Sequence, residues 1–426
     1  MFKSLKNAHQ RNTVRYYALI LALLSFLFFS GDFGMIDVQK TAIVMAVGVD
    51  KQDDTFIVTS QIAIPKPSKQ GPSSQTVQIV SRGKTVADAF EEINAKTGWY
   101  PKLVFCRLIL LGEKTVQTDV FDALDFFLLD EYLSDNCLIA TCDTTAKELL
   151  NVAALVDSSG ALAMEKVLSS HAERVGLVLP ATLRTFSIGY FSDSQSAFLP
   201  VLKTQPQQEQ IGGETGSGSS GSAGGSSQGS SGSSSSSGGE QGGQGNEQGS
   251  QGGQEKDKPV FSASETALFV RGKRVGTLSK EETFAVNAVR AHLKLAAYSV
   301  QIDDAACTLN IKNNAVKRKL RVGQNGLATL QLTIQLTAGM LDYSKSLPLE
   351  QTKDAGDTPN GAFYAAERSL SAQLQTAFEK CKTCGCDLFG IQESLQKYRK
   401  KDYKKYKETA LQSARLDASI RFISLR

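Results

Sequence analysis

The sequence predicts an α/β (α+β) protein in which mixed, largely antiparallel sheets and helices form two or three lobes after an N-terminal membrane segment. Three observations carry this prediction. The chain has 426 residues, more than one core of about 100 to 200 residues accommodates. Strand-like and helix-like patterns alternate on both sides of a Gly/Ser-rich stretch. A basic leader with an apolar run precedes them.

Residues 1–35 are this leader and a membrane anchor or signal. Four cations precede the apolar run and no acidic residue occurs before Asp32, which places the N-terminus in the cytoplasm and the rest of the chain outside. The length fits a cleaved signal, but Phe28 and Ser30 before Gly31 make a poor cleavage site, which favours an uncleaved anchor. The predicted anchor residues are Tyr16, Leu19, Ile20, Leu23, Leu24, Phe26, Leu27, Phe28 and Phe29.

Residues 36–204 are predicted to form an N-terminal α/β domain. Residues 41–49 and 56–64 have the pattern of a hairpin, and a helix begins after Thr85 and ends at Gly98. Pro180 and Pro200 mark the end of the domain. Further strands are expected at residues 77–81, 103–111 and 137–141, and further helices at residues 120–130, 145–150 and 162–171.

Residues 205–258 are predicted to be a disordered linker. Gly, Ser, Gln and Glu dominate, so the segment cannot bury enough apolar surface to offset the entropy of ordering it. A Gly/Ser coil of this length spans on the order of 40 Å, which would let lobes on either side move independently. Its glycines lack the strand, helix and lysine of a phosphate-binding loop.

Residues 259–426 are predicted to form a C-terminal α/β region of one or two lobes with antiparallel pairing. Its best-defined boundary is the capping box Ser279–Glu282, which starts a helix reaching about Leu295. Strands are expected at residues 264–270, 299–302, 307–312, 317–322, 326–339 and 415–425, and helices at residues 363–381 and 388–411.

No metal or cofactor site is predicted. Cys106 and Cys137 lie in apolar strand-like runs and are expected in the core. Cys381, Cys384 and Cys386 form the one pattern that resembles a metal or redox site, but zinc needs four ligands and the three histidines have no matching spacing. A structural role, a local disulfide, and metal or redox chemistry are the alternatives for this cluster.

Catalytic residues are not predicted either, and the sequence indicates a protein that is not an enzyme. His171 and His292 fall in predicted helices, and no Gly-x-Ser-x-Gly elbow occurs in an ordered segment. Carboxylates such as Glu91 and Glu92 are adjacent on a helix and therefore point apart. The net charge of +4 is small and the cations concentrate at the chain ends, so nucleic acid is not a predicted partner.

A basic stretch near the C-terminus is interleaved with tyrosines. It is predicted to be helical and to rest on anionic headgroups or on an acidic partner, with an ordinary solvated face as the alternative. The predicted contact residues are Lys397, Arg399, Lys400, Lys401, Lys404, Lys405 and Lys407.

Five sequence blocks point to a known family. They are AIVMAVGVD at residues 42–50, GKTVADA at 83–89, LDFFLLD at 124–130, ETALFVRGKRVGTL at 265–278 and CDLFG at 386–390. In this order they resemble the C subunit of spore germination receptors, the Ger(x)C family. The resemblance implies extracytoplasmic α/β domains on the outer face of the spore inner membrane. It also implies two multispanning partner subunits in a nutrient germinant receptor.

The chain departs from that family at three places. No Cys occurs at residues 29–32, where the family usually has a lipobox Cys, so lipid anchoring is not expected. The Gly/Ser linker looks like an insertion, and Leu129 stands where the family tends to have Arg. The alternative function is a generic extracytoplasmic adaptor or solute-binding protein with a membrane anchor. Neither the germinant nor direct germinant binding is predicted.

Overall fold

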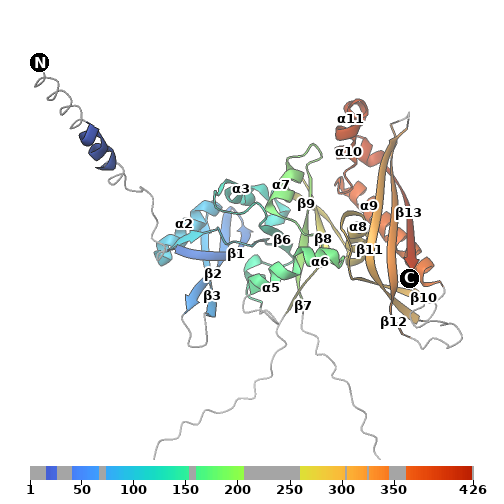
Figure 1. Cartoon of the computed structure of the whole chain (residues 1–426), viewed down its shortest axis with the longest axis horizontal. Coiled ribbons are helices and arrows are strands. Elements are labelled where there is room, and N and C mark those ends of the chain that lie inside the picture. The colour runs from blue at the N-terminus through green and yellow to red at the C-terminus, as the bar shows by residue number, and fades with distance from the viewer. Residues whose placement is uncertain are drawn as a thin grey trace, which may run out of the picture.

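The computed structural model describes residues 16–25, 41–66, 73–152, 160–205, 260–302, 305–323, 326–344 and 361–424. Figure 1 shows two sheets next to each other, each with helices packed on it. Most strand pairs within them are antiparallel. The predicted α+β class is therefore confirmed.

The first sheet contains nine of the described strands. They are β1 (Thr41–Gln52), β2 (Thr55–Lys66), β3 (Ser73–Gly83), β4 (Tyr100–Lys102), β5 (Leu108–Leu111), β6 (Leu138–Cys142), β7 (Ser196–Gln205), β8 (Val260–Val270) and β9 (Lys273–Leu278). Their order is β3-β2-β1-β5-β6-β7-β8-β9, with β4 beside β1. The central strands β1, β5, β6 and β7 are parallel, and antiparallel strands flank them on both sides.

β1 lies in the middle of this sheet. Its predicted hairpin with β2 is confirmed, with Val49 opposite Val58. Val47 and Val49 enter one hydrophobic core, whereas Ala46 enters the core on the opposite face. Both faces of the strand are thus covered, which explains the nearly continuous apolar run that predicted it.

Helices cover both faces of the first sheet. α2 (Val86–Thr97) has the predicted start and stop: Thr85 and Asp88 form a capping box, and Gly98 ends the helix at φ 68°. The residue that caps the C-terminus of the helix needs a positive φ, which glycine adopts without strain. The others are α3 (Phe121–Leu129), α4 (Ala146–Leu150), α5 (Gly160–Val167), α6 (Ser170–Arg174) and α7 (Leu183–Tyr190).

Several predicted elements differ from the structure. The strand expected at residues 103–111 begins only at Leu108, because a turn in which the Cys106 N–H donates to the Leu103 carbonyl precedes it. The helix expected at residues 162–171 is divided into α5 and α6, since Ser169 caps a new helix. Pro200 lies inside β7 rather than at a boundary, and α7 was not predicted.

The strands on either side of the Gly/Ser stretch are neighbours. β7 and β8 pair antiparallel along their length, from Ser196 opposite Val270 to Gln205 opposite Val260. β8 and β9, which the sequence suggested for the C-terminal region, therefore complete the first sheet. The parts of the chain before and after residues 206–259 are therefore also connected by the hydrogen bonds between β7 and β8.

The second sheet has the order β10-β11-β12-β13. The strands are β10 (Ala296–Ile302), β11 (Ala305–Val322), β12 (Ala328–Tyr343) and β13 (Arg415–Ser424). β11 replaces the two short strands expected at 307–322, and it continues through a register shift between Ile311 and Asn313. β13 runs parallel to β12, so the expectation of antiparallel pairing fails for this strand.

Five helices accompany the second sheet in the described part of the chain. They are α8 (Lys280–Arg290), α9 (Ala362–Cys384), α10 (Ile391–Tyr398), α11 (Lys400–Tyr406) and α12 (Ala410–Ser413). α9 packs against β10 and β13 and against α8. α8 ends at Arg290 rather than near Leu295, and the helix expected at residues 388–411 is divided into α10, α11 and α12.

Candidate functional site at the junction of the two sheets

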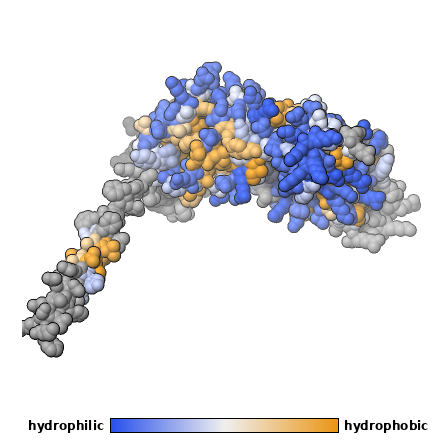
Figure 2. Space-filling model, turned by 90° about the horizontal axis from the view of Figure 1, so that it is seen from above, coloured by the Kyte–Doolittle hydropathy of each residue, from blue (hydrophilic) through white to orange (hydrophobic). Residues whose placement is uncertain are grey.

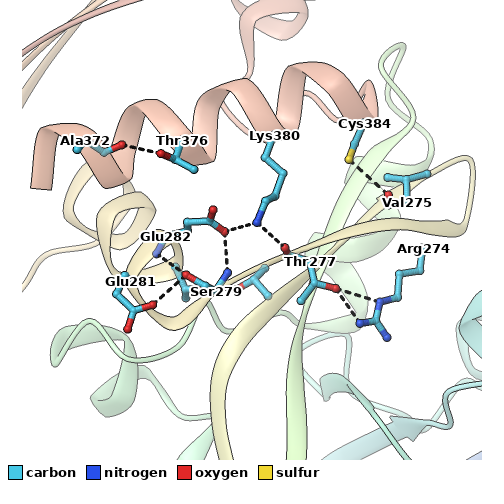
Figure 3. Close-up of polar contacts among 12 residues, drawn as sticks. Arg274, Val275, Thr277, Ser279, Glu281, Glu282, Ala372, Thr376, Lys380 and Cys384 are labelled. Carbon is cyan, nitrogen blue, oxygen red and sulfur yellow. Dashed lines mark hydrogen bonds and ion pairs between the residues drawn. The ribbon is translucent and has the colours of Figure 1, made fainter. Parts of the chain in front are cut away.

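Helix α8 begins with the predicted capping box, and the box also holds α9. Ser279 Oγ accepts the Glu282 N–H at 3.3 Å, and the Glu282 carboxylate accepts the Ser279 N–H at 2.7 Å. Lys380 of α9 donates to the same carboxylate at 2.6 Å and to the Thr277 carbonyl at 3.2 Å (Figure 3). Glu282 is only 4% exposed, so one partner of this ion pair is buried. The pair joins α8, α9 and β9.

The other side of α8 is attached to the first sheet. Asn287 Nδ2 donates to the carbonyls of Gly176 at 3.0 Å and Val178 at 2.8 Å, in the segment after α6. Thr283 Oγ1 donates to Thr266 Oγ1 of β8 at 3.2 Å. Both side chains are fully buried, and a buried polar group that loses its partner costs about 1–3 kcal/mol. α8 therefore fixes the two sheets relative to each other.

The turn at residues 386–390, one of the five family-like blocks, forms a second connection. The Asp387 N–H donates to Ser196 Oγ at the start of β7, at 2.9 Å. The Asp387 carboxylate accepts the N–H groups of Ile391 at 2.6 Å and Gln392 at 2.8 Å, which caps α10. Burial raises the pKa of this carboxyl to about 6, although the two N–H bonds and a nearby guanidinium oppose the rise.

Two arginines hold the carbonyls of the same turn. Arg290, at the end of α8, donates to the Leu388 carbonyl at 2.7 Å, and its guanidinium lies 5.0 Å from the centre of an aromatic ring of β7. Arg318 of β11 donates to the carbonyls of Phe389 and Gly390. The turn thus contacts β7, α8 and β11, and no local signal in the sequence marked Arg290 or Arg318 as its partner.

The seven predicted basic residues are all exposed and lie together on α10 and α11 and at their ends. Lys397 pairs with Glu393 at 3.6 Å, and Arg399 pairs with Asp402 at 3.3 Å. Within the described ranges, Lys400, Lys401, Lys404 and Lys407 have no acidic side chain within 4.0 Å. Figure 2 shows the contrast on one face: hydrophobic side chains gather over the N-terminal region, and hydrophilic ones dominate over the C-terminal region.

α10 and α11 are also attached to the part of the chain that forms the first sheet, through Asp193, which lies between α7 and β7. Its carboxylate accepts hydrogen bonds from Gln396 Nε2 at 2.5 Å and from the Tyr403 hydroxyl at 2.6 Å. Burial, together with the hydrogen bond to Asp193, raises the pKa of Tyr403 to about 12. The basic helices are therefore held in a defined position relative to both sheets.

The predicted anchor is described only in part. Residues 16–25 are helical, and the side chains of Tyr16, Leu19, Ile20, Leu23 and Leu24 are exposed. Phe26, Leu27, Phe28 and Phe29 lie outside the described residues. No helix among the described residues has the length and apolar character needed to cross a membrane.

The seven cysteines lie in the described part of the chain, and all of them are free thiols. Cys106 and Cys137 are buried, as predicted. Cys381 and Cys386 are buried free thiols, and the Cys384 Sγ contacts the Val275 carbonyl at 3.4 Å. Burial raises the pKa of Cys386 to about 12, so this thiol is protonated at neutral pH. No described group of three His, Cys, Asp or Glu side chains is placed to hold a metal ion.

Comparison with known proteins gives matches to both regions. The family model described as "Spore germination protein N-terminal domain" matches residues 34–204, and "Spore germination B3/ GerAC like, C-terminal" matches residues 264–421. Among solved structures, one described as "Crystal Structure of the GerBC protein" is 14% identical, with a TM-score of 0.49, and the alignment covers 89% of this chain and 97% of that chain. No curated protein matches.

Proposed function

The chain belongs to the GerAC-like family of spore germination proteins, and on this premise we propose that it is the membrane-anchored, extracytoplasmic C subunit of a spore nutrient germinant receptor. It would act by assembly with multispanning subunits of the same complex. The observation that carries this proposal is that the N- and C-terminal models of one family match the two regions in order and together cover most of the chain.

The junction supports a role in assembly rather than in turnover. Its charged groups hold the fold together: Glu282 forms a helix cap and an ion pair, Asp387 forms a second cap, and Arg290 donates to a backbone carbonyl. A catalytic site needs a nucleophile, a base and a charge-stabilising group around an accessible cavity. The proposed activity is therefore docking and transmission within a complex, without chemistry of its own.

The proposed location is the outer face of the spore inner membrane. Four cations precede the apolar run and no acidic residue occurs before Asp32. This charge distribution supports an anchor with its N-terminus in the cytoplasm and the rest of the chain outside. Protease added to intact protoplasts should degrade the chain beyond Asp32, and protection of that part would refute the topology. The absence of a Cys at residues 29–32 also leads us to expect no diacylglyceryl adduct in intact-mass analysis.

Two experiments test the receptor role. Deleting the gene in a spore former should abolish or blunt germination with one class of nutrient, while germination by non-nutrient triggers stays intact. Affinity purification of the tagged chain from spore membranes should recover two multispanning partners. A chain that purifies alone, or that is made only in vegetative cells, would instead support the generic extracytoplasmic adaptor.

A further inference from the structure

A cavity of about 390 Å³ opens between β11 and α10. Arg318 and Leu320 line it from β11, and Ser394, Tyr398 and Arg399 line it from α10 and its C-terminal end. Two guanidinium groups, two hydroxyls and one apolar wall therefore surround a space large enough for a small ligand. No carboxylate is among the described residues that line this space.

Arg318 is held rigidly at one wall of the cavity. Its Nη2 donates to two carbonyls of the turn at residues 386–390. Nε and Nη1 have no hydrogen-bond acceptor in the described ranges, and they are the groups left to bind a ligand. A guanidinium fixed by backbone contacts loses little entropy when it binds, which favours affinity.

Arg399 lines the same cavity from the C-terminal end of α10. It stands at the break between α10 and α11, where its backbone N–H donates to the Leu395 carbonyl at 2.8 Å. Its side chain is 46% exposed and is oriented by Asp402 at 3.3 Å, which engages Nη1 alone. Arg399 thus adds a second, solvent-accessible guanidinium to the lining of the cavity.

The local charge favours an anion. Lys397, Lys400 and Lys401 lie on the same two helices close to Arg399. The nearby carboxylates already have partners: Glu393 pairs with Lys397, Asp402 pairs with Arg399, and Asp387 accepts two backbone N–H groups at the start of α10. Planar guanidinium groups match the oxygens of phosphate through paired hydrogen bonds, and such charge-assisted bonds are stronger than neutral ones. An anion with several oxygen atoms offers acceptors for both arginines.

We propose that this cavity is a phosphate-binding site in which Arg318 and Arg399 hold the phosphate oxygens. The Tyr398 hydroxyl is a third donor, and Leu320 packs against the organic part of the ligand. The same chemistry serves a free phosphate and the phosphodiester of a lipid headgroup. Only the orientation of the site toward a membrane rests on the proposed function, and phosphate binding itself does not.

Amide hydrogen exchange of residues 391–407 tests the site in the full chain. The chain is kept in a maltoside detergent, which contains no phosphate. One arm adds inorganic phosphate, with chloride at matched ionic strength as its control, and the other adds phosphatidylglycerol to the micelles. At about ten times the dissociation constant, exchange from the opened state should slow about tenfold. Slowing by phosphate identifies a soluble ligand, and slowing by phosphatidylglycerol alone identifies a headgroup. No slowing in either arm overturns the proposal.

Two variants, one that conserves charge and one that removes a charge elsewhere, separate a built site from general attraction. Arg399→Lys keeps the charge but loses the planar fork, so the affinity should fall about tenfold. Lys312→Gln removes an exposed charge of β11 that does not line the cavity, and it should change the affinity less than about twofold. Equal effects of the two variants would overturn the proposal. Partner recovery from spore membranes is a separate measurement, so failure of phosphate binding would leave the receptor role standing.

Discussion

Lys380 Nζ of α9 lies 2.6 Å from the carboxylate of Glu282, the residue that also caps α8. One side chain thereby caps the N-terminus of α8 and ties this helix to α9, and both helices pack beside β9. Because Glu282 is buried and Lys380 is 37% exposed, removal of the acid has a larger effect than an exposed ion pair would.

Two substitutions of Glu282 should lower the free energy of unfolding by different amounts. Glu282→Gln keeps an acceptor for the Ser279 N–H but loses the ion pair, and we expect a loss of about 1 kcal/mol. Glu282→Ala loses both and should cost about 2–3 kcal/mol. Urea unfolding measures the difference. Glu281→Gln, the exposed neighbour in Figure 3, is the control and should change stability by less than about 0.5 kcal/mol; a loss equal to that of Glu282→Ala would contradict the assignment.

Replacing residues 206–259 with a short turn should preserve the fold. β7 and β8 are antiparallel neighbours, so a hairpin of ordinary length can join Gln205 to Val260. Shortening a closed loop from about 54 residues to about four reduces the closure entropy by about 2 kcal/mol, which should appear as added stability in urea unfolding. A segment of the same length and composition in scrambled order should leave stability unchanged. Loss of cooperative unfolding in the shortened chain would argue against the pairing.

The pH dependence of stability should contain a contribution from Asp387. Its pKa is raised from 3.8 to about 6 in the fold, so the folded state binds more protons than the unfolded state in this window. The stabilising contribution is therefore complete below about pH 4 and is lost as the pH rises through about 6. Relative to wild type, Asp387→Asn should gain on the order of 3 kcal/mol in free energy of unfolding across that window. Asp417→Asn, on the exposed face of β13, should follow the wild-type curve. If the free energy of unfolding of Asp387→Asn varied with pH in parallel with that of wild type, the raised pKa would be refuted.

Neutralising part of the basic helices should weaken contact with an anionic surface. Each cation near such a surface contributes at most about 1 kcal/mol, so Lys400, Lys401 and Lys404 changed together to Gln should weaken binding about tenfold or more at low salt. Sedimentation with phosphatidylglycerol vesicles of a chain that starts at residue 36 measures this without the anchor. Lys312, Lys317 and Lys319 of β11 are exposed matched controls. Equal binding by both triple variants and the wild type would mean that the basic residues form an ordinary solvated face rather than a contact surface.

Local signals predicted much of the fold. Thr85, Gly98 and Ser279 each mark a helix end by a side-chain or backbone requirement that acts within four residues, and all three are where the sequence placed them. The alternation along β12 was also readable, because one face of the strand is buried and the other is wet.

What the sequence did not predict depends on distant partners. Arg290 and Arg318 contact the turn at residues 386–390 from positions about a hundred and about seventy residues earlier, as their hydrogen bonds show. Nothing in the local pattern of either arginine indicates that partner. The place of β8 was missed for a similar reason: composition marks a linker, but only hydrogen bonding shows that its two ends return to the same ladder.

The long interval between β7 and β8 also affects the order in which the fold is completed. A chain is made from its N-terminus at roughly 5–20 residues per second. The edge of β7 therefore stays unpaired for roughly 3–10 s, until residues 206–259 have been made and β8 follows. An open strand edge is a template for wrong pairing during that time. Residues 206–259 contain almost no large apolar or β-branched side chain, so the chain that emerges first offers that edge no competing strand. The composition of the insertion would thus protect a half-built sheet during synthesis and export.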